Sequence, residues 1–175
     1  RLLEGHGTDR RIDVDVIPLD EICAPGGDIP APDYFSIDVE GAELDILRGA
    51  ARSLKESVVW LRSEMWIHPV YEGAATMEES LAYLKHTGFD LFHMEPYSEY
   101  EAERLTLGMH GRGQTLGAEV DFQRRVGDLV EHAAFDRPAM ILKLYKLAFM
   151  AFLKGGNGLG LHSLKQASST VLSCW

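Results

Sequence analysis

The feature that most constrains the fold is an abrupt change of pattern between residues 34 and 54. Residues 34–37 (YFSI) form a short apolar run of residue types that favour β-strands. After a four-residue junction, residues 38–41 (DVEG), the apolar positions take the spacing of one helical face, namely Leu44, Leu47, Ala51 and Leu54. A strand that passes directly into a helix is the repeating unit of α/β proteins, so the sequence predicts that class of fold.

The alternation of strand and helix continues along the chain. Residues 58–61 (VVWL) predict a second buried strand. Thr76 followed three residues later by Glu79 is a capping box, and the helix that it starts is expected to end at Gly88. Residues 89–94 are the next strand candidate. This order, with short joints, predicts a mostly parallel sheet with helices on its faces.

Further elements are predicted on either side of this alternation. Upstream, residues 11–16 alternate like a strand, and residues 19–22 have the pattern of a short helical turn. Downstream, residues 96–119 are polar and glycine-rich, which is typical of a hairpin or an excursion. Residues 120–123 are the candidate for a last strand.

Composition limits the class of protein. The chain has 175 residues with 17 basic and 27 acidic side chains, a formal net charge of −10. This acidic balance argues against a nucleic-acid-binding face. Two cysteines, Cys23 and Cys174, supply neither a disulfide framework nor a cluster of metal ligands. We recognise neither a signal peptide nor an apolar run of membrane-spanning length, and therefore expect a cytoplasmic protein.

The charge is unevenly distributed along the chain. Residues 1–136 hold 12 bases and all 27 acids (12 − 27 = −15), whereas residues 137–175 hold five bases and no acid. This division predicts a separate C-terminal element. Its main feature is an apolar helix over residues 139–153, which starts near Asp136. Apolar residues nearly encircle this helix, which favours packing on the domain or across a homodimer interface over contact with a membrane surface.

Two glycine-rich runs have a superficial likeness to a cofactor-binding loop. Residues 156–160 read G-x-G-x-G, but a cofactor loop must follow a strand and open a helix. This run follows an apolar helix instead, so we interpret it as a helix stop and linker. By the same argument residues 108–113 are predicted to be a flexible loop.

Carboxylates mark the ends of the first two predicted strands. Asp38 and Glu40 stand where the first strand gives way to a helix N-terminus, and Glu64 follows the second strand. Ligands of open α/β sheets bind beyond the carboxyl ends of the strands, so these three side chains are expected to converge on one cleft. The alternative interpretation is that Glu40 only caps the helix and that Glu64 is a solvated strand end.

A histidine follows these carboxylates in the sequence, and the carboxylates themselves are possible metal ligands. His68 lies four residues beyond Glu64 and could take the proton of an attacking hydroxyl, although a solvated or backbone-bonded loop histidine is the commoner case. The spacing of histidines and cysteines does not fit a structural zinc site. The three carboxylates could hold a hard divalent ion, but the sequence nearby does not require one, and we predict no metal site.

Two segments resemble the FkbM-type S-adenosylmethionine-dependent methyltransferases. They are residues 17–22 (IPLDEI), in which a leucine–aspartate pair leads into a helix, and residues 33–50 (DYFSIDVEGAELDILRGA). The second resembles the family's run D-x-x-K-I-D-V-E-G-A-E-x-x-V/I-L-x-G-A almost completely. The resemblance covers about residues 11–125. One departure is Ser36, where the family commonly has lysine.

The resemblance implies a Rossmann-like class I methyltransferase fold in which residues 34–37 are the fourth of seven strands. It implies transfer of a methyl group from S-adenosylmethionine to a hydroxyl oxygen of a sugar, glycan, lipid or polyketide-type metabolite. Asp38, Val39 and Glu40 are the implied cofactor-binding residues, with Asp38 at the boundary between cofactor and acceptor. The candidate catalytic residues are Asp38, Glu64 and His68.

The resemblance also bears on domain organisation. In this fold the cofactor lies mainly on a glycine-rich turn after the first strand and on an acidic residue ending the second, both expected upstream of Arg11. We therefore expect residues 1–126 to be the C-terminal part of a methyltransferase domain, truncated on its N-terminal side and inactive alone, and residues 127–175 to be a helical extension. The alternative is a non-catalytic α/β binding or assembly module derived from a methyltransferase.

Overall fold

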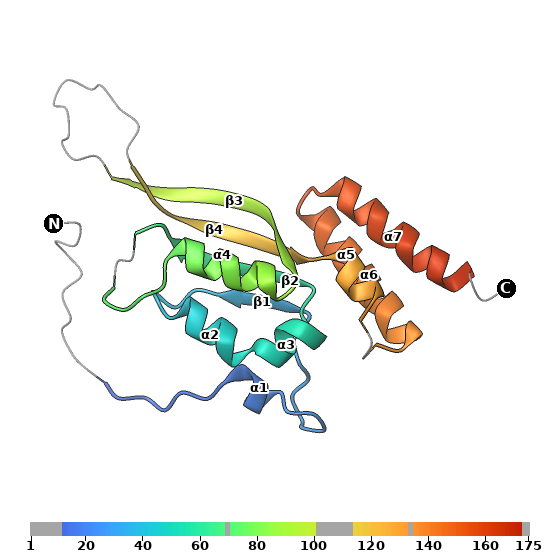
Figure 1. The fold of residues 1–175 in the computed structure, drawn as a ribbon, viewed down its shortest axis with the longest axis horizontal. Helices are drawn as coiled ribbons and strands as arrows, with labels where there is room; N and C mark the ends of the chain where they lie inside the picture. Colours follow the sequence, from blue (N-terminus) through green and yellow to red (C-terminus); the bar gives the residue numbers. More distant parts are fainter. Residues whose placement is uncertain (1–11, 69–70, 101–113, 133–134, 173–175) are drawn as a thin grey trace, which may run out of the picture.

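The computed structural model describes residues 12–68, 71–100, 114–132 and 135–172. The chain follows the order shown in Figure 1. Its first half contains α1 (Leu19–Ile22), β1 (Tyr34–Ile37), α2 (Glu43–Gly49), α3 (Ala51–Glu56), β2 (Trp60–Trp66) and α4 (Met77–His86). Its second half contains β3 (Phe89–Tyr100), β4 (Gln114–Arg124), α5 (Val126–Val130), α6 (Arg137–Leu153) and α7 (Asn157–Leu172).

A mixed sheet with the strand order β1-β2-β4-β3 forms the centre of the molecule. β1 and β2 are parallel, while β4 is antiparallel to both β2 and β3. The α/β fold is confirmed, and this sheet with its helices is compatible with a Rossmann-like methyltransferase fold. The expectation of a mostly parallel sheet is wrong. β1, β2 and β3 point the same way as expected, but β4 lies between β2 and β3 in the opposite direction and separates them.

Two hydrophobic cores lie on opposite faces of the sheet. Trp60 and Leu61 are neighbours on β2, and because successive strand residues point to opposite faces, each belongs to a different core. Leu61 packs in a core that α2, α3 and α4 complete with Leu44, Leu47, Leu54 and Leu84. Trp60 packs in a core that α5, α6 and α7 complete with Leu129, Leu144, Leu147 and Ala167. The C-terminal helices therefore pack on the domain, as the first of the alternatives for the apolar helix predicted.

The junction after β1 forms as predicted, with one difference in the helix that follows. Leu44, Leu47 and Leu54 are buried on one side, but the helix is divided into α2 and α3 at Ala50, and Ala51 is exposed. Ala50, the residue between the two helices, is fully buried, so the break itself is packed in the core. Farther on, the capping box of Thr76 and Glu79 is confirmed by both of its hydrogen bonds, and Gly88 ends α4 with a φ of 94°.

The strand predicted over residues 11–16 is wrong for its described part. Residues 12–17 have no regular structure, and the side chains of Ile12, Val14 and Val16 are exposed. Alternating apolar and polar side chains stabilise a strand only where it pairs with another strand. None of the described strands pairs with this segment. The helical turn at residues 19–22 is confirmed as α1.

The polar region predicted over residues 96–119 forms the paired ends of β3 and β4 in its described part. β3 and β4 pair in an antiparallel register out to Tyr100 and Gln114, and the candidate strand at residues 120–123 is part of β4. The loop predicted for residues 108–113 lies outside the described residues.

The C-terminal run of glycines is part of a helical hairpin. Gly155, with a φ of 78°, ends α6 as predicted, but α7 begins at once, so residues 156–160 are a helix start and not a linker. A Cβ atom at Gly160 would lie 2.7 Å from the ring of Phe152, so the absent side chain lets α7 pack closely on α6. Among the described residues, none of the helices has the length and apolarity that crossing a membrane requires.

Candidate active site

A tight turn at the carboxyl end of β1 builds the site. Glu40 and Gly41 take φ values of 57° and 114°, so two successive residues lie in the left-handed region. A Cβ atom at Gly41 would lie 3.1 Å from both Ala74 Cβ and Tyr71 Cδ2. Glycine is therefore required here both for its backbone conformation and for the close approach of the segment before α4. The turn reverses the chain so that α2 can begin at Glu43.

Glu43 holds this turn from the inside. Its side chain is buried, and its Oε1 accepts hydrogen bonds from the backbone N–H groups of Val39 (3.3 Å) and Gly41 (3.0 Å). Both donors belong to the turn, so the carboxylate fixes the backbone that carries Asp38 and Glu40. The sequence interpretation missed this role. The available signal was the last glutamate of the segment DVEGAE, an acidic residue on the first turn of a helix.

Three carboxylates meet beside this turn. Asp38 and Glu40 are exposed at the end of β1, and Glu64 is buried on the parallel strand β2. One carboxylate oxygen from each lies within 4.8 Å of the others, so the expected convergence is confirmed. Oxygen ligands at this spacing could hold a hard divalent cation, and they would also favour a cationic ligand.

Two aromatic side chains donate hydrogen bonds to the carboxylates. The hydroxyl of Tyr71 donates to Glu40 Oε2 at 3.1 Å, and Trp66 Nε1 donates to Glu64 Oε2 at 3.3 Å. The hydrogen bond to Glu40 raises the pKa of Tyr71 above its ordinary value, so the phenol stays protonated and remains a donor. The sequence interpretation assigned no role to either residue, because the contact between Tyr71 and Glu40 joins segments 31 residues apart.

His68 and Val39 complete the set of predicted site residues. His68 is exposed on the segment after β2, and its role as a base stays a prediction. Val39 is exposed between the two carboxylates, and its amide is one of the donors to Glu43. The structure thus places Asp38, Val39, Glu40 and Glu64 at one edge of the sheet, with His68 on the segment beyond it.

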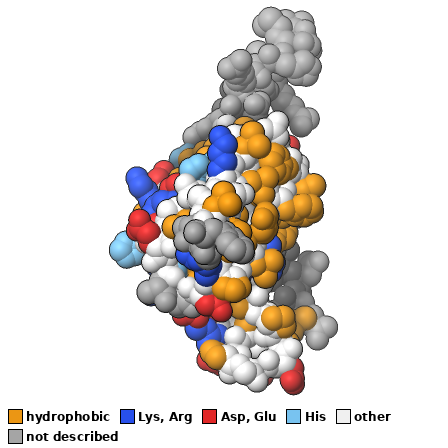
Figure 2. Space-filling view, turned by 90° about the vertical axis from the view of Figure 1, so that its right-hand side faces the viewer, with side chains coloured by type: hydrophobic (Ala, Val, Ile, Leu, Met, Phe, Trp, Pro, Cys, Tyr) orange, Lys and Arg blue, Asp and Glu red, His pale blue; other side chains and the backbone are white. Residues whose placement is uncertain are grey.

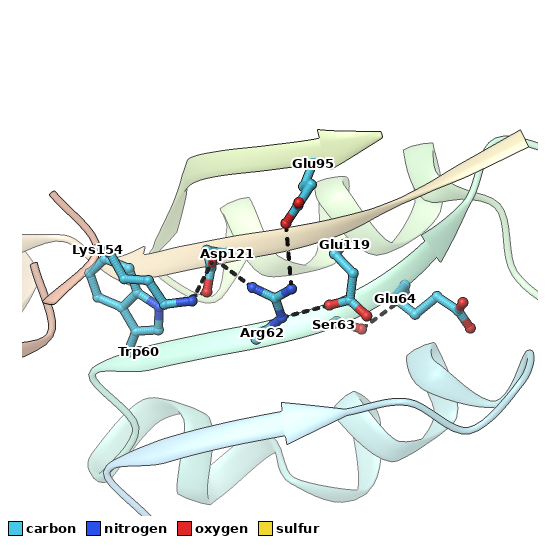
Figure 3. Close-up of polar contacts among 8 residues, drawn as sticks. All are labelled: Trp60, Arg62, Ser63, Glu64, Glu95, Glu119, Asp121 and Lys154. Atoms are coloured by element: carbon cyan, nitrogen blue, oxygen red, sulfur yellow. Dashed lines mark hydrogen bonds and ion pairs between the residues drawn. The ribbon is translucent and has the colours of Figure 1, made fainter. Parts of the chain in front are cut away.

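A polar network centred on Arg62 lies next to Glu64 on the sheet (Figure 3). Glu64 and Glu119 are directly opposite each other on β2 and β4, a pairing of like charges. Arg62, two residues before Glu64, offsets this with an ion pair of 2.7 Å from its Nε to Glu119 Oε2. Its guanidinium also contacts Asp121 at 3.2 Å and Glu95 at 3.8 Å.

Asp121 links this network to the C-terminal helices. It is almost fully buried, and its carboxylate accepts hydrogen bonds from Trp60 Nε1 (3.0 Å) and from Lys154 Nζ (3.1 Å) (Figure 3). Ser36, the residue that departs from the FkbM pattern, lies beside Arg62 in the parallel register of β1 and β2. Arg62 therefore places a cation on β2, next to the position on β1 where the family pattern has lysine.

The leucine–aspartate pair of the first resembling segment also has a structural role. Asp20 accepts hydrogen bonds from the backbone N–H groups of Arg52 (2.6 Å) and Ser53 (2.9 Å) and from the Ser53 hydroxyl (2.7 Å). These amides lie in the first turn of α3, where the helix itself supplies no acceptor. Asp20, 32 residues before Arg52 in the sequence, therefore caps that helix.

One known protein family matches the chain. The sequence profile of the methyltransferase FkbM domain matches residues 3–91, which is about half of the chain. The chain belongs to the FkbM methyltransferase family. The match contains the capping aspartate Asp20, the turn at residues 38–41 and Glu64, and it ends within β3. No curated protein and no solved structure matches the chain.

Family membership confirms the resemblance drawn from residues 17–22 and 33–50. It supports methyl transfer as the activity. The match begins before residue 11 and stops before β4, so the part of the resemblance that covers residues 92–125 lies outside it. The structure nevertheless pairs β4 with β2 and β3 in one sheet.

Proposed function

We propose that this protein transfers a methyl group from S-adenosylmethionine to a hydroxyl oxygen, at the edge of the sheet where β1 and β2 end. The observation that carries the proposal is the convergence of Asp38, Glu40 and Glu64 within 4.8 Å at the turn of the family motif. Ligands of α/β sheets bind at this position relative to the strands.

The residues of this edge fit the cofactor chemically. S-adenosylmethionine supplies an electrophilic methyl group on a positively charged sulfur. Three carboxylates are favourable neighbours for a cation, and the oxygens of Asp38 and Glu40 are exposed acceptors for hydroxyl groups. In our proposal Asp38, Val39 and Glu40 contact the cofactor, and Asp38 stands at its boundary with the acceptor.

The acceptor side of the reaction requires orientation and removal of a proton. A hydroxyl oxygen must approach the methyl group in line with the bond that breaks, so positioning supplies much of the rate. Glu64 is buried beside the exposed carboxylates and is held by Trp66, which suits it to orient the acceptor hydroxyl. We propose that Glu64 or His68 accepts the proton that the hydroxyl loses. Sugars, glycans, lipids and polyketide-type metabolites all carry such hydroxyl groups.

Photolabelling with methyl-tritiated S-adenosylmethionine tests the position of the cofactor. Ultraviolet irradiation followed by trypsin should place the label in the peptide of residues 12–48, and unlabelled S-adenosylhomocysteine should compete it away. Asp38→Asn should reduce labelling several-fold, whereas Asp45→Asn, an exposed acid on the first turn of α2, should not. Label confined to residues 155–165, which contain the glycine run of α7, would overturn the proposal.

A further inference from the structure

Tyr71 contacts the candidate site from a separate segment of the chain. Its hydroxyl donates a hydrogen bond of 3.1 Å to Glu40 Oε2, and among the described residues it is the polar partner of that carboxylate. Glu40 is exposed and takes a φ of 57°, a left-handed conformation that residues other than glycine rarely adopt. Such a conformation persists where the surrounding structure holds it, and functional sites are a common place for it. Tyr71 is therefore the side chain that sets the direction of this carboxylate.

The ring of Tyr71 is seated against the backbone of Gly41. A Cβ atom at Gly41 would lie 3.1 Å from Tyr71 Cδ2 and 3.5 Å from Tyr71 Cβ. The absence of a side chain at position 41 therefore makes room for the tyrosine as well as allowing the turn. The residue that turns the chain after β1 thus also places a phenol beside Glu40.

The two ends of this hydrogen bond are anchored independently. The backbone around Glu40 is held by Glu43, which accepts hydrogen bonds from the amides on either side of it. The carbonyl of Tyr71 accepts a hydrogen bond of 3.2 Å from the N–H of Ala74, which closes a turn directly before the capping box of α4. The bond between Tyr71 and Glu40 therefore joins two fixed segments. A carboxylate held in this way loses little conformational freedom when a ligand binds.

A phenol suits this position better than a basic side chain does. Asp38, Glu40 and Glu64 meet within 4.8 Å, and a lysine or arginine would neutralise part of the charge that favours a sulfonium ion. The hydrogen bond to Glu40, together with the neighbouring carboxylates, raises the pKa of Tyr71, so its hydroxyl stays neutral and remains a donor. Tyr71 thus orients Glu40 without reducing its charge, and it leaves the other carboxylate oxygen as an acceptor for a ligand.

We propose that Tyr71 is a positioning residue of the methyl-transfer site, which orients the Glu40 carboxylate toward the cofactor. Tyr71 acts through Glu40 and not by touching the cofactor itself. The inference rests on the proposed function, because it takes S-adenosylmethionine as the ligand of Glu40.

Two other tyrosines provide matched controls. Tyr83 on α4 donates its hydroxyl to a backbone carbonyl of α2 at 3.3 Å, so Tyr83→Phe removes a hydrogen bond of similar length. Tyr145 is 46% exposed, close to the 38% of Tyr71, and lies on α6, one of the helices on the side of the molecule that Figure 2 views. α6 contacts the other end of β1, where Lys143 binds Asp33. Neither control hydroxyl belongs to the turn after β1.

Titration of the ¹⁵N-labelled protein with S-adenosylmethionine, followed by NMR, tests the inference. Tyr71→Phe keeps the ring and removes the hydroxyl, and it should weaken the affinity about fivefold, the usual effect of one hydrogen bond. Tyr83→Phe and Tyr145→Phe should leave the affinity unchanged. In a Glu40→Ala background Tyr71→Phe should have no further effect, because its acceptor is already gone. Thermal unfolding shows whether each variant is folded.

A label on the phenol gives a signature that a purely structural role would not produce. In protein with ¹³Cζ-labelled tyrosine, the Tyr71 signal should shift when Glu40→Ala removes its acceptor. In the wild type the same signal should shift when S-adenosylmethionine binds. The signal of Tyr83 should stay in place in both experiments.

The outcomes separate this inference from the proposed function. If Asp38→Asn weakens the binding of S-adenosylmethionine and Tyr71→Phe does not, the positioning role is wrong and the proposed function stands. An equal loss for Tyr71→Phe with and without the Glu40 carboxylate would show that Tyr71 acts on its own, which also contradicts the inference. A wild-type protein that does not bind S-adenosylmethionine would overturn both.

Discussion

Oε1 of Glu43 accepts a hydrogen bond of 3.0 Å from the backbone N–H of Gly41. The same oxygen accepts the N–H of Val39, so one buried carboxylate holds the turn whose left-handed residues present Asp38 and Glu40. Glu43, the last acid of the segment DVEGAE, thus holds the backbone of the site from its buried side. The two acids before it, Asp38 and Glu40, are exposed.

Removing this carboxylate should therefore loosen the turn and destabilise the fold. Glu43→Ala leaves two backbone donors without their acceptor, which we expect to cost about 1–3 kcal/mol in the free energy of unfolding. Glu43→Gln keeps an acceptor oxygen and should cost less. The exposed Asp45→Ala should stay within about 0.5 kcal/mol of the wild type. Urea unfolding gives these values, and equal stability of Glu43→Ala and Asp45→Ala would contradict the role of Glu43.

The distant cap on α3 gives a second prediction. Asp20 accepts three hydrogen bonds from Arg52 and Ser53, so Asp20→Ala should lower the free energy of unfolding by about 1–2 kcal/mol, the usual cost of losing a helix cap. The adjacent Glu21→Ala, on the exposed side of α1, is the matched control. Hydrogen exchange at the amides of Arg52 and Ser53 should accelerate in the Asp20 variant alone. Unchanged exchange there would show that the cap is not stabilising.

Much of the fold near the site could be predicted because its signals are local. The change of period after Ile37 located β1 and its junction, and the capping box at Thr76 located α4. The order of the sheet could not be predicted, because the position of β4 between β2 and β3 depends on contacts between distant segments. For the same reason the alternation at residues 11–16 predicted a strand that the described residues 12–16 do not form, since a strand needs a neighbour that the sequence pattern does not specify.

The same distinction between local signals and distant contacts applies to the residues of the candidate site. Asp38, Glu40 and Glu64 were predictable because Asp38 and Glu40 follow one predicted strand directly and Glu64 lies just beyond the next, although the structure extends β2 through Glu64. Tyr71 was not, because it reaches Glu40 from a segment whose path has no periodic signal. Glu43 looked like an ordinary acid of a helix N-terminus, and it is its burial and its two hydrogen bonds to the turn that distinguish it from Asp45.

The pairing of Asp33 with two lysines predicts a pH dependence of stability. Burial by itself would raise the pKa of Asp33, but hydrogen bonds and charges from Lys143 and Lys146 outweigh it and hold the pKa below its ordinary value. Because the folded pKa is lower than the unfolded one, the stabilisation is complete above the ordinary value of about 3.9 and is lost as the pH falls through the folded pKa.

The measurement is thermal unfolding at a series of pH values. The wild type should lose stability as the pH falls below about 4, and Asp33→Asn should reduce this loss while lowering stability at neutral pH. Asp28→Asn, in the exposed loop before β1, should follow the wild-type curve. Parallel curves for Asp33→Asn and the wild type would show that Asp33 is not the group that titrates.

The cation beside Ser36 gives a prediction about the departure from the family pattern. Arg62→Met removes the cation that binds Glu119 and Asp121, and should cost about 2 kcal/mol in the free energy of unfolding. Since Ser36 lies next to position 62, Ser36→Lys in that variant should recover part of the loss. Ser36→Gln, which has length without charge, should recover none. Equal behaviour of the lysine and glutamine variants would exclude an exchange of charge between the strands.

In our proposal the turn at residues 38–41 contacts the cofactor, S-adenosylmethionine. The most direct measurement is a titration of the ¹⁵N-labelled protein with S-adenosylhomocysteine, followed by NMR, which detects binding even at millimolar affinity. We expect the amide signals of Asp38, Val39, Glu40 and Gly41 to shift, and Asp38→Asn to weaken the shifts where Asp45→Asn does not. Signals of residues 38–41 that stay unchanged at millimolar ligand would contradict the claim.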